Sequence, residues 1–584
     1  MKHQENLILN HLKESIVRAL NQLEHSDILS GQEILKLFTS PPNQKMGHFA
    51  FPCFPLAKAL KKGPPQIASE LANHIAEDEL ISEAKGVGPY LNFFIKTNKL
   101  NDLLFKRIEN GEYFEGLLID KPSKLMIEYS QPNTHKELHV GHMRNLCLGN
   151  ALVRIKKYVG ENVIPVTYPG DVGTHVAKCL WYLKMHHQGD IPAENKGEWL
   201  GKVYSTANLK LEDEKGTPAE EKNREQLTEI LKQLHGKSGE YYDLWKETRE
   251  WSLKLMHKAY DWADVKFDRW FYESEVDEPS TAIIKKLYDN GKLIKDDGAI
   301  GMDLSEEKLG FCLLLKSDGT GLYATKDVAL AIRKTEEFGV EKNIYIVDDR
   351  QKRHFQQVFK VLEKVGYEDV SRNCYHLPYN VVELPSGAMS SRDGNIIPLM
   401  ELVSKMEAKI TEDYLERYRG QWTDEEIKKT AHAVAGGAIK YGMIRVDNNR
   451  KIVFDMDEWL KLDGETGPYL QYVHARINSL LLKFKIKGEV DSSKLTHDLE
   501  LALILKLSFF NETVLTCADK NSTMGLCSYL YELCKLFNSF YAECPIGKEA
   551  DKEIQKARLM LTSSVGKVIK EGLSLLGIEA PERM

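Results

Sequence analysis

Three histidines and a lysine fall within eight positions of the stretch NTHKELHVGHMRN, residues 133–145. They are His135, Lys136, His139 and His142. Imidazoles donate hydrogen bonds to phosphate oxygens, a lysine adds a full positive charge, and Gly141 leaves room for a base or ribose against the backbone. This chemistry suits an α-phosphate that becomes pentavalent, because its extra negative charge is present only in the transition state.

The elements around this cluster place it at the start of a helix. KLMIEYS, residues 124–130, predicts a short apolar strand, and residues 143–160 carry apolar side chains at helical spacing. The free N–H groups and the dipole of a first helical turn make an anion site. NVIPVTYPGDVGTH, residues 162–175, is a second strand that runs into a glycine-rich loop, so the order predicts a βαβ unit and a parallel sheet.

An H-x-G-H tetrapeptide alone leaves other interpretations open. A metal site would need carboxylate or cysteine partners at ligand spacing, and His139 and His142 have none nearby in the sequence. A structural role is the better interpretation for a single isolated histidine. The position between a strand and a helix favours phosphate binding.

A second stretch, AMSSRDGN, could close over a triphosphate from the other side. After an apolar strand it carries Met389, Ser390, Ser391 and Arg392. By itself this stretch is typical of a surface turn. Together with the histidine cluster it indicates a mobile loop that clamps phosphates.

Size and composition limit the class of protein. At 584 residues the chain is too long for one core, and its length predicts about three or four domains. A net charge of −7 does not indicate a nucleic-acid binder, although a basic face can lie on an acidic protein. The nine cysteines include no C-x-x-C pair, which argues against zinc knuckles and disulfide frameworks. No apolar run approaches the roughly 18 residues of a membrane span, so we expect a reduced, cytoplasmic protein.

The pattern along the chain predicts an α/β domain between other regions. Residues 1–112 indicate a mixed α+β domain and residues 113–400 the α/β domain, with a charged helical insertion at about 186–260. Residues 401–465 indicate a helical connector and residues 466–584 an all-α bundle. Further strand-like runs are FCLLLKS (311–317), NIYIVDD (343–349) and NVVEL (380–384).

HVGH and MSSR, in this order and separation, resemble the two signatures of class I aminoacyl-tRNA synthetases. The longer stretch EYSQPNTHKELHVGHMRN is similar to the arginyl-tRNA synthetase version, in which a lysine precedes the first signature. Further similar stretches are YPGDVGTH, LYATKDVALA, DDRQKRHFQQVF, MSSRDGN, GPYLQYVHARI and PYLNFF. The resemblance covers nearly the whole chain.

The resemblance implies a Rossmann-type catalytic domain, an N-terminal domain that meets the tRNA elbow and a helical anticodon-binding bundle. It implies that L-arginine is activated with ATP, accompanied by Mg²⁺ and without a protein-bound metal site. Transfer to the 2′-hydroxyl of the terminal adenosine of tRNA(Arg) would follow. The first step generally needs the tRNA in this family. We also expect a monomer with no membrane attachment.

Arginine-binding positions of the family match five residues here. A guanidinium is a planar permanent cation, so its pocket needs carboxylates within bidentate reach. Asp327 and Tyr323, four apart on an expected helix, are assigned to the guanidinium, although by themselves they would suit a solvated face. Glu128 would add negative charge, and Asn133 and Gln351 would bind the α-amino and carboxylate ends.

Candidate tRNA contacts lie at both ends of the chain. In the C-terminal bundle they are Tyr469, Tyr472, His474 and Arg476. Their aromatic and cationic faces are those that unstacked bases prefer, although spacing alone would place several in a core. In the N-terminal domain the matching positions are Tyr90 and Asn92.

Two departures and two alternative functions stay open. Ala388 and Ser391 stand where the second signature of class I enzymes commonly has lysines, and the change at Ser391 is frequent in this family. The alternatives are a small-molecule nucleotidyltransferase and a non-catalytic tRNA-binding relative. The long region after the second signature argues against the first, and the intact His139, His142 and Asp327 argue against the second.

Overall fold

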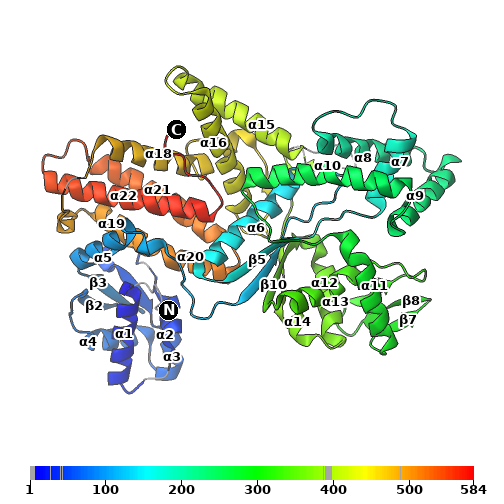
Figure 1. Cartoon of the computed structure of the whole chain (residues 1–584). Helices are drawn as coiled ribbons and strands as arrows, with labels where there is room; N and C mark the ends of the chain where they lie inside the picture. Colours follow the sequence, from blue (N-terminus) through cyan, green and yellow to red (C-terminus); the bar gives the residue numbers. More distant parts are fainter. Residues whose placement is uncertain are drawn as a thin grey trace.

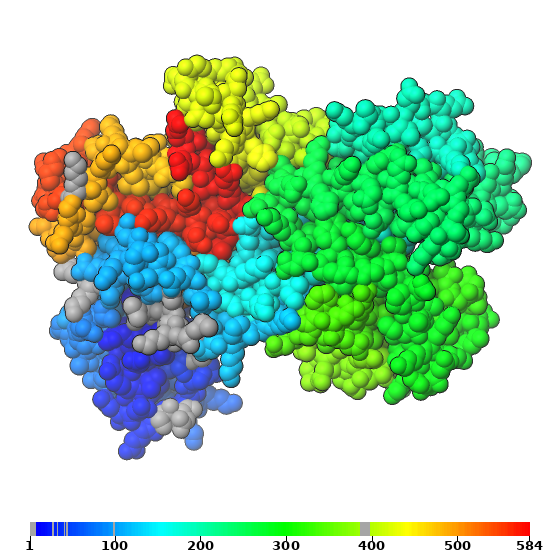
Figure 2. Space-filling view, viewed as in Figure 1, coloured from blue at the N-terminus to red at the C-terminus, as the bar shows by residue number. Residues whose placement is uncertain are grey.

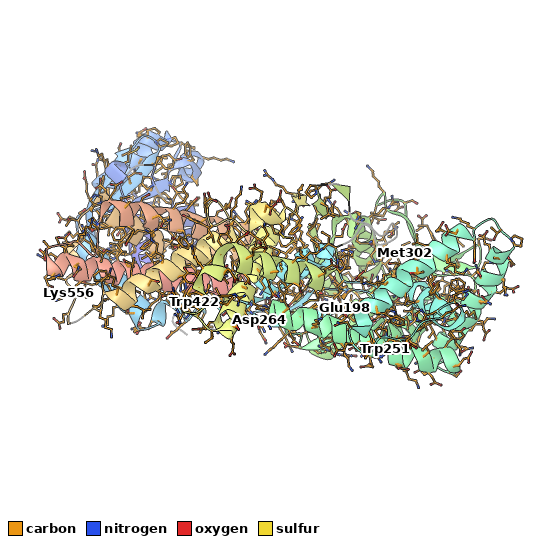
Figure 3. The ribbon with its side chains drawn as sticks, turned by 90° about the horizontal axis from the view of Figure 1, so that it is seen from above. Glu198, Trp251, Asp264, Met302, Trp422 and Lys556 are labelled. Atoms are coloured by element: carbon orange, nitrogen blue, oxygen red, sulfur yellow. The ribbon has the colours of Figure 1, made fainter. Side chains whose placement is uncertain are left out.

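The computed structural model describes residues 7–25, 28–39, 41–42, 44–385, 387–388, 397–486 and 488–584. A small domain forms the N-terminal end, a parallel sheet lies at the centre with a group of helices beside it, and a helical bundle forms the C-terminal end (Figure 1). Seen from above, the molecule is elongated, with Lys556 of the bundle toward one end and Trp251 of the central helices toward the other (Figure 3).

The central sheet is parallel throughout, as the βαβ pattern predicts. Its strand order is β11 (Cys374–Tyr379), β10 (Lys342–Asp348), β4 (Lys124–Glu128), β5 (Asn162–Thr167) and β6 (Arg269–Trp270). Helix α6 (Val140–Val159) connects β4 to β5. Strand β4 reads as an apolar run rather than an alternating one because helices cover both faces of such a sheet. The α/β fold class is confirmed.

Two predicted strands lie outside this sheet. β9 (Gly310–Leu315) forms an antiparallel sheet with β7 (Ile294–Asp296) and β8 (Ala299–Leu304). β12 (Val382–Leu384) pairs with β13 (Gly387–Ala388) and with β14 (Ile452–Val453). Apolar composition predicts that a strand forms, but it does not determine which sheet the strand joins.

The charged segment at 186–260 folds as a group of long helices. They are α8 (Lys196–Asp213), α9 (Ala219–His235) and α10 (Glu240–Ala263), which pack with α7 (Thr174–Met185). Trp181, Ile230 and Trp245 are buried in a small core of their own. We call residues 186–263 the insertion. It stands at one side of the central sheet (Figure 1).

The rest of the central domain surrounds the sheet. Its elements are α11 (Glu273–Asp289), α12 (Tyr323–Phe338), η3 (Asp349–Gln351), α13 (Lys352–Lys364) and α14 (Glu368–Asn373). The N-terminal domain contains α1 (Leu7–Gln22), α2 (Gly31–Leu37), η1 (Gln44–Met46), β1 (Phe49–Pro52), α3 (Phe54–Leu60), α4 (Pro64–Asn73), β2 (Ile81–Val87), β3 (Tyr90–Ile95), α5 (Thr97–Glu109) and η2 (Glu112–Phe114). Its sheet is antiparallel, with strand order β1-β3-β2.

Beyond residue 397 the described chain is almost entirely helical. The connector contains α15 (Leu399–Ile410), η4 (Thr411–Leu415), η5 (Glu416–Tyr418), α16 (Asp424–Ile444) and α17 (Met456–Trp459). The bundle contains α18 (Gly467–Lys483), η6 (Ser492–Lys494), α19 (Asp498–Ser508), α20 (Phe510–Lys520), α21 (Met524–Glu543) and α22 (Lys552–Leu575). Side-chain caps start α16 and α18: Thr423 accepts from the Glu426 N–H at α16, and Thr466 accepts from the Tyr469 N–H at α18.

One hydrophobic core runs through the N-terminal domain, the central sheet and the bundle. It includes Leu12, Phe49, Ile127, Val473 and Leu573, all with 1% exposure or less. In the space-filling view these parts touch one another without a break (Figure 2). Among the described residues no single helix is long and apolar enough to cross a bilayer; the bent pair α19–α20 passes that test only when both helices are joined.

Candidate functional site

The two histidines of the first signature are held by backbone N–H groups at the start of α6. His139 is the N-cap residue, and its Nδ1 accepts from the Gly141 N–H at 3.1 Å. His142 Nδ1 accepts from the His139 N–H at 3.1 Å. The centroids of the two rings lie 4.0 Å apart. A neutral imidazole that accepts at Nδ1 carries its proton on Nε2. Each ring therefore has an Nε2–H to donate to a ligand.

Both imidazoles are neutral at physiological pH. Burial, together with the nearby Lys136 charge, lowers the pKa of His139 to about 4. Burial lowers the pKa of His142 further, with smaller contributions from His139 and Lys136. These rings act as hydrogen-bond donors, and the positive charge of the cluster comes from Lys136.

Gly141 is needed first for the histidine cap. A Cβ at this position would lie 2.8 Å from His139 Cε1, closer than real Cβ contacts come. The His139 ring therefore borders the space over Gly141 in which we expected a base or ribose.

Lys136 points toward the insertion. Its Nζ lies 5.2 Å from the centre of the Tyr204 ring on α8, and within the described residues no carboxylate forms an ion pair with it. His135, the first histidine of the cluster, is fully buried, and both of its ring nitrogens contact threonine hydroxyls. His135 therefore cannot donate to a phosphate in this conformation.

The expected guanidinium residues lie at the start of α12. Tyr323 is its first residue and is 76% exposed, and Asp327 follows one turn later with a side chain that is 22% exposed. His354 Nε2 on α13 lies 2.5 Å from Asp327 Oδ2. His354 was not singled out from the sequence, although it belongs to the quoted stretch DDRQKRHFQQVF.

Glu128 does not offer the uncompensated negative charge that the sequence suggested. Its Oε2 forms a short ion pair with Lys334, a lysine with no exposed surface. Gln131 Nε2 also donates to Glu128 Oε1 at 3.3 Å. A buried carboxylate needs such partners because it has lost its water. Lys334 lies 206 residues from Glu128 along the chain.

Asn133 and Gln351 occupy different surroundings. Asn133 forms a parallel bridge with Gly170, and a Cβ on that glycine would lie 2.4 Å from Asn133 Oδ1. Gln351 is exposed at the N-terminus of α13. Both follow a strand of the central sheet, so they lie at its carboxyl edge with the first signature.

Tyr168 is a residue of this edge that the sequence reading missed. It follows β5, and burial is the main reason that its pKa is raised well above the usual value. The neighbouring carboxylates of Asp327, Glu273 and Glu128 raise the pKa further. Tyr168 is therefore a neutral phenol surrounded by acids. Its signal was the stretch YPGDVGTH, quoted only for its resemblance.

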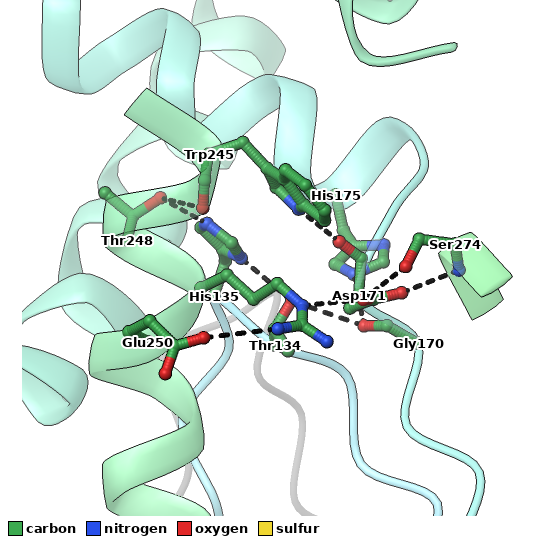
Figure 4. Close-up of polar contacts among 10 residues, drawn as sticks. Thr134, His135, Gly170, Asp171, His175, Trp245, Thr248, Glu250 and Ser274 are labelled. Atoms are coloured by element: carbon green, nitrogen blue, oxygen red, sulfur yellow. Dashed lines mark hydrogen bonds and ion pairs between the residues drawn. The ribbon is translucent and has the colours of Figure 1, made fainter. Parts of the chain in front are cut away.

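Asp171, in the same stretch, joins three parts of the central domain (Figure 4). Its carboxylate is fully buried and accepts from Arg249 Nε at 2.8 Å and from the Ser274 N–H and hydroxyl at 2.8 and 2.7 Å. Trp245 Nε1 donates to the Asp171 carbonyl at 2.6 Å. These contacts fix the loop after β5 against α10 of the insertion and the start of α11.

The second signature lies outside the described residues. Its residues Met389, Ser390, Ser391 and Arg392 are therefore not placed. The chain on either side is described: Ala388 ends β13, and Pro398 bridges His139 in antiparallel fashion. The Leu399 N–H donates to the Leu138 carbonyl at 2.8 Å. The backbone that leaves the second signature therefore runs beside the first.

The candidate tRNA contacts of the N-terminal domain differ in accessibility. Tyr90 is 37% exposed and lies edge-on to Phe54, with ring centroids 6.0 Å apart. Asn92 is buried, and its Nδ2 donates to the Met46 carbonyl at 2.7 Å. Asn92 stays a predicted tRNA contact, but its side chain is buried in this conformation and its amide N–H is taken by Met46.

The bundle candidates also divide into exposed and buried residues. Tyr472 is 37% exposed, and the Arg476 guanidinium lies 4.5 Å from the centre of the Tyr541 ring. Tyr469 is half-buried, with its hydroxyl accepting from Asn538. His474 is 3% exposed, and its Nδ1 lies 3.0 Å from the Pro581 carbonyl. His474 therefore offers no stacking face.

Three stretches of the chain match known domain families. Residues 110–456 match tRNA synthetases class I (R), catalytic domain; residues 470–584 match the DALR anticodon binding domain; residues 10–95 match the Arginyl tRNA synthetase N terminal domain.

Whole proteins are similar over their full length. An arginine–tRNA ligase of Bdellovibrio bacteriovorus is 54% identical over 580 residues, which cover 99% of this chain and 98% of the relative. One from Halothermothrix orenii is 34% identical, with 98% and 99% covered. The solved structure of Thermus thermophilus arginyl-tRNA synthetase aligns with a TM-score of 0.83 at 27% identity, covering 99% of this chain and 100% of that one.

Proposed function

The chain belongs to the arginyl-tRNA synthetase family, and we propose that it activates L-arginine with ATP to arginyl-adenylate and transfers the arginine to the 2′-hydroxyl of the terminal adenosine of tRNA(Arg). One observation carries the proposal at the site. The neutral donors His139 and His142 follow β4, while Tyr168, with the carboxylates of Asp327 and Glu273 near it, follows β5 at the same edge of one parallel sheet. Phosphate donors and a cation pocket thus adjoin, as the attack of an arginine carboxylate on an α-phosphate requires.

In the adenylation step, the Nε2–H groups of His139 and His142 donate to the phosphates of ATP. Lys136 supplies the positive charge from the loop before α6, and Gly141 keeps the histidine cap intact. We assign the other side of the triphosphate to Met389, Ser390, Ser391 and Arg392, on the loop that returns beside His139. Mg²⁺ arrives with ATP and is held chiefly by phosphate oxygens and water, as is usual for this ion in phosphate sites.

For arginine recognition, Asp327 is the main anionic partner of the guanidinium. His354 occupies Oδ2, and among the described side chains none has a hydrogen bond to Oδ1, which leaves that oxygen for the substrate. The hydroxyls of Tyr323 and Tyr168 complete the set of acceptors. Glu128, already paired with Lys334, contributes to the shape of the pocket and to its hydrogen bonds. Asn133 and Gln351 bind the α-amino and carboxylate groups.

Such a pocket discriminates against lysine by geometry. A lysine has one compact ammonium and would leave buried acceptors without a donor. Sites built on hydrogen bonds of this kind reach discriminations of about 10⁴ without editing.

For tRNA, residues 1–112 would meet the elbow through Tyr90, and residues 466–584 would bind the anticodon through Tyr469, Tyr472 and Arg476. Tyr472 is the most accessible of these in the bundle. We further propose that the enzyme works in the cytoplasm as a monomer.

The test is ATP–pyrophosphate exchange scanned over the amino acids, with and without tRNA(Arg). We expect exchange with arginine alone among the amino acids, and charging of tRNA(Arg). Exchange that depends on a different small molecule would favour a nucleotidyltransferase of another kind. Binding of tRNA with no exchange under any condition would favour a non-catalytic relative.

A further inference from the structure

The insertion contacts the loop that carries Lys136 through a buried histidine. We propose that His135, bound to Thr248 and Ser252 on α10, is a positioning residue through which the insertion sets the place of Lys136 for adenylate formation. This inference rests on the proposed function, and it assigns to the insertion a part in catalysis.

The backbone at His135 adopts a conformation that needs external support. Its φ is +60°, in the left-handed region that non-glycine residues rarely adopt. The residue is fully buried, and its N–H donates to Ser252 Oγ at 2.9 Å. Such conformations persist when the surroundings over-determine them, and they cluster at functional sites.

The shorter contacts of the His135 ring fit one tautomer (Figure 4). The Thr248 hydroxyl donates to the Leu244 carbonyl at 2.9 Å, so at 2.8 Å it accepts from His135 Nε2–H. His135 Nδ1 then accepts from the Thr134 hydroxyl at 2.9 Å, a shorter contact than the 3.3 Å from that hydroxyl to the Gly170 carbonyl. Burial lowers the pKa of His135 to about 3, so the ring keeps this neutral form at any working pH. The loop before the first signature is therefore attached to α10 at two points.

A second helix of the insertion lies against the next residues of the loop. On α8, a Cβ at Gly201 would lie 2.8 Å from the Glu137 backbone nitrogen, so this helix packs directly on the chain after Lys136. The Lys136 ammonium rests over Tyr204, three residues further along α8. The loop backbone is thus fixed from α10 and α8, so the Lys136 side chain starts from a defined point.

The position of this contact in the chain also points to Lys136. His135 precedes Lys136 directly, and the Lys136 charge already lowers the pKa of His139 and His142, which shows that its ammonium lies within electrostatic reach of both. A small displacement of the loop would move a transition-state cation, and misplacements of about 1 Å can lower rates by about 100-fold.

The test is a double-mutant cycle in exchange with tRNA present. Lys136→Met should lower kcat by roughly 100-fold with little change in KM for ATP or arginine, the scale of one lost transition-state donor. Thr248→Val, which removes the hydroxyl at similar volume, should lower kcat about tenfold. If it acts through Lys136, the double variant should be no slower than Lys136→Met alone, within about twofold.

Two further variants separate positioning from folding. His135→Asn tolerates the left-handed backbone but cannot reach Thr248, so it should show the same non-additive loss. Thr228→Val on α9 removes a hydroxyl that likewise donates to its own helix, at the Arg224 carbonyl, and should leave kcat unchanged. Unfolding midpoints of all variants report any general damage.

Multiplicative losses in the double variant would overturn the inference, because Thr248 would then act independently of Lys136. An unchanged kcat for Thr248→Val or for Lys136→Met would overturn it as well, while leaving the arginine-dependent exchange of the wild type intact. Absence of that exchange in the wild type would instead refute the proposed function.

Discussion

In the proposed arginine site, the carboxylate of Asp327 is the main anionic partner of the guanidinium. His354 holds Oδ2, and the helix position of Asp327 fixes the direction of Oδ1. Asp327→Asn keeps the size but removes the charge that faces the substrate. A charge-assisted pair contributes about 1.5–3 kcal/mol, so we expect KM for arginine to rise about 10- to 150-fold in exchange assays while KM for ATP stays unchanged.

The matched control is Glu336→Gln, which removes an exposed carboxylate from the same helix. It should leave both KM values unchanged. A KM for arginine within about threefold of the wild type in Asp327→Asn would remove this residue from the pocket.

At the residue scale, the sequence could name chemical types but not their partners. His139 and His142 stand out by type and spacing, and Asp327 by its match to a position of the family. The pairing of Glu128 with Lys334 and of Asp327 with His354 depends on contacts between distant segments, which no local pattern reveals. Asn92 and His474 are candidate tRNA contacts in the sequence, yet each is buried with a backbone carbonyl as a hydrogen-bond partner.

At the scale of elements, α6 is attached to the neighbouring loops by one buried guanidinium. Arg144, 1% exposed, donates to the carbonyls of Asn380, Asp447, Asn448 and Arg450. Burial lowers its pKa to about 10. These carbonyls belong to the chain before β12 and the chain before β14, so Arg144 ties the first signature helix to the strand that leads to the second signature.

Arg144→Met should therefore destabilise the protein by about 2–4 kcal/mol, because it leaves several buried carbonyls without a donor. Urea unfolding followed by circular dichroism measures the loss. Lys157→Met on the same helix changes an exposed side chain and should change stability by no more than about 1 kcal/mol. Equal losses of unfolding free energy in the two variants would mean that the hydrogen bonds to these carbonyls do not attach α6 to the loops.

The loops around the first signature also predict how stability depends on pH. Burial lowers the pKa of His135 and His175 to about 3 and that of His139 to about 4, whereas an unfolded histidine titrates near 6.5. Between about pH 4 and 6.5 the unfolded chain binds more protons than the folded one, so stability falls as the pH falls.

Each of these histidines should contribute a slope of roughly 1.4 kcal/mol per pH unit below pH 6.5, and none above about pH 7.5. Urea midpoints at pH 7.5, 6.5 and 5.5 measure it. His135→Asn should reduce the slope. A slope that His135→Asn leaves unchanged would contradict the neutral, buried state of that ring.

At the scale of the whole molecule, the order of the domains can be predicted from the sequence, but the way in which they pack against one another cannot. Strand and helix periodicities predict an α/β domain followed by a bundle, and both are present. The contacts that join the N-terminal domain to the bundle span most of the chain: Asn101 Nδ2 donates to the Ser492 carbonyl, and the Tyr113 hydroxyl donates to the Leu507 carbonyl. Local patterns carry no information on such pairs.

This packing of the domains changes how the bundle can be tested. A chain ending at residue 465 would expose core residues of α5 and α6 that pack on α20 and α22, so lost activity would report lost folding. Surface substitutions in the full chain avoid that ambiguity. Tyr472 is exposed, and Arg476 lies one turn further along the same face of α18.

We expect the double variant Tyr472→Ala, Arg476→Gln to raise the Kd for tRNA(Arg) by about 10- to 100-fold, since stacking of an unpaired base contributes about 1–3 kcal/mol. The unfolding midpoint should stay that of the wild type, because neither side chain is fully buried. Leu482→Ala, on α18 and 72% exposed, is the control for a surface change and should bind tRNA normally. Binding measured over a salt series separates the lost stacking from the lost charge, because only the loss of a phosphate contact lowers the salt dependence. Unchanged Kd in the double variant would exclude this face of α18 from the anticodon site.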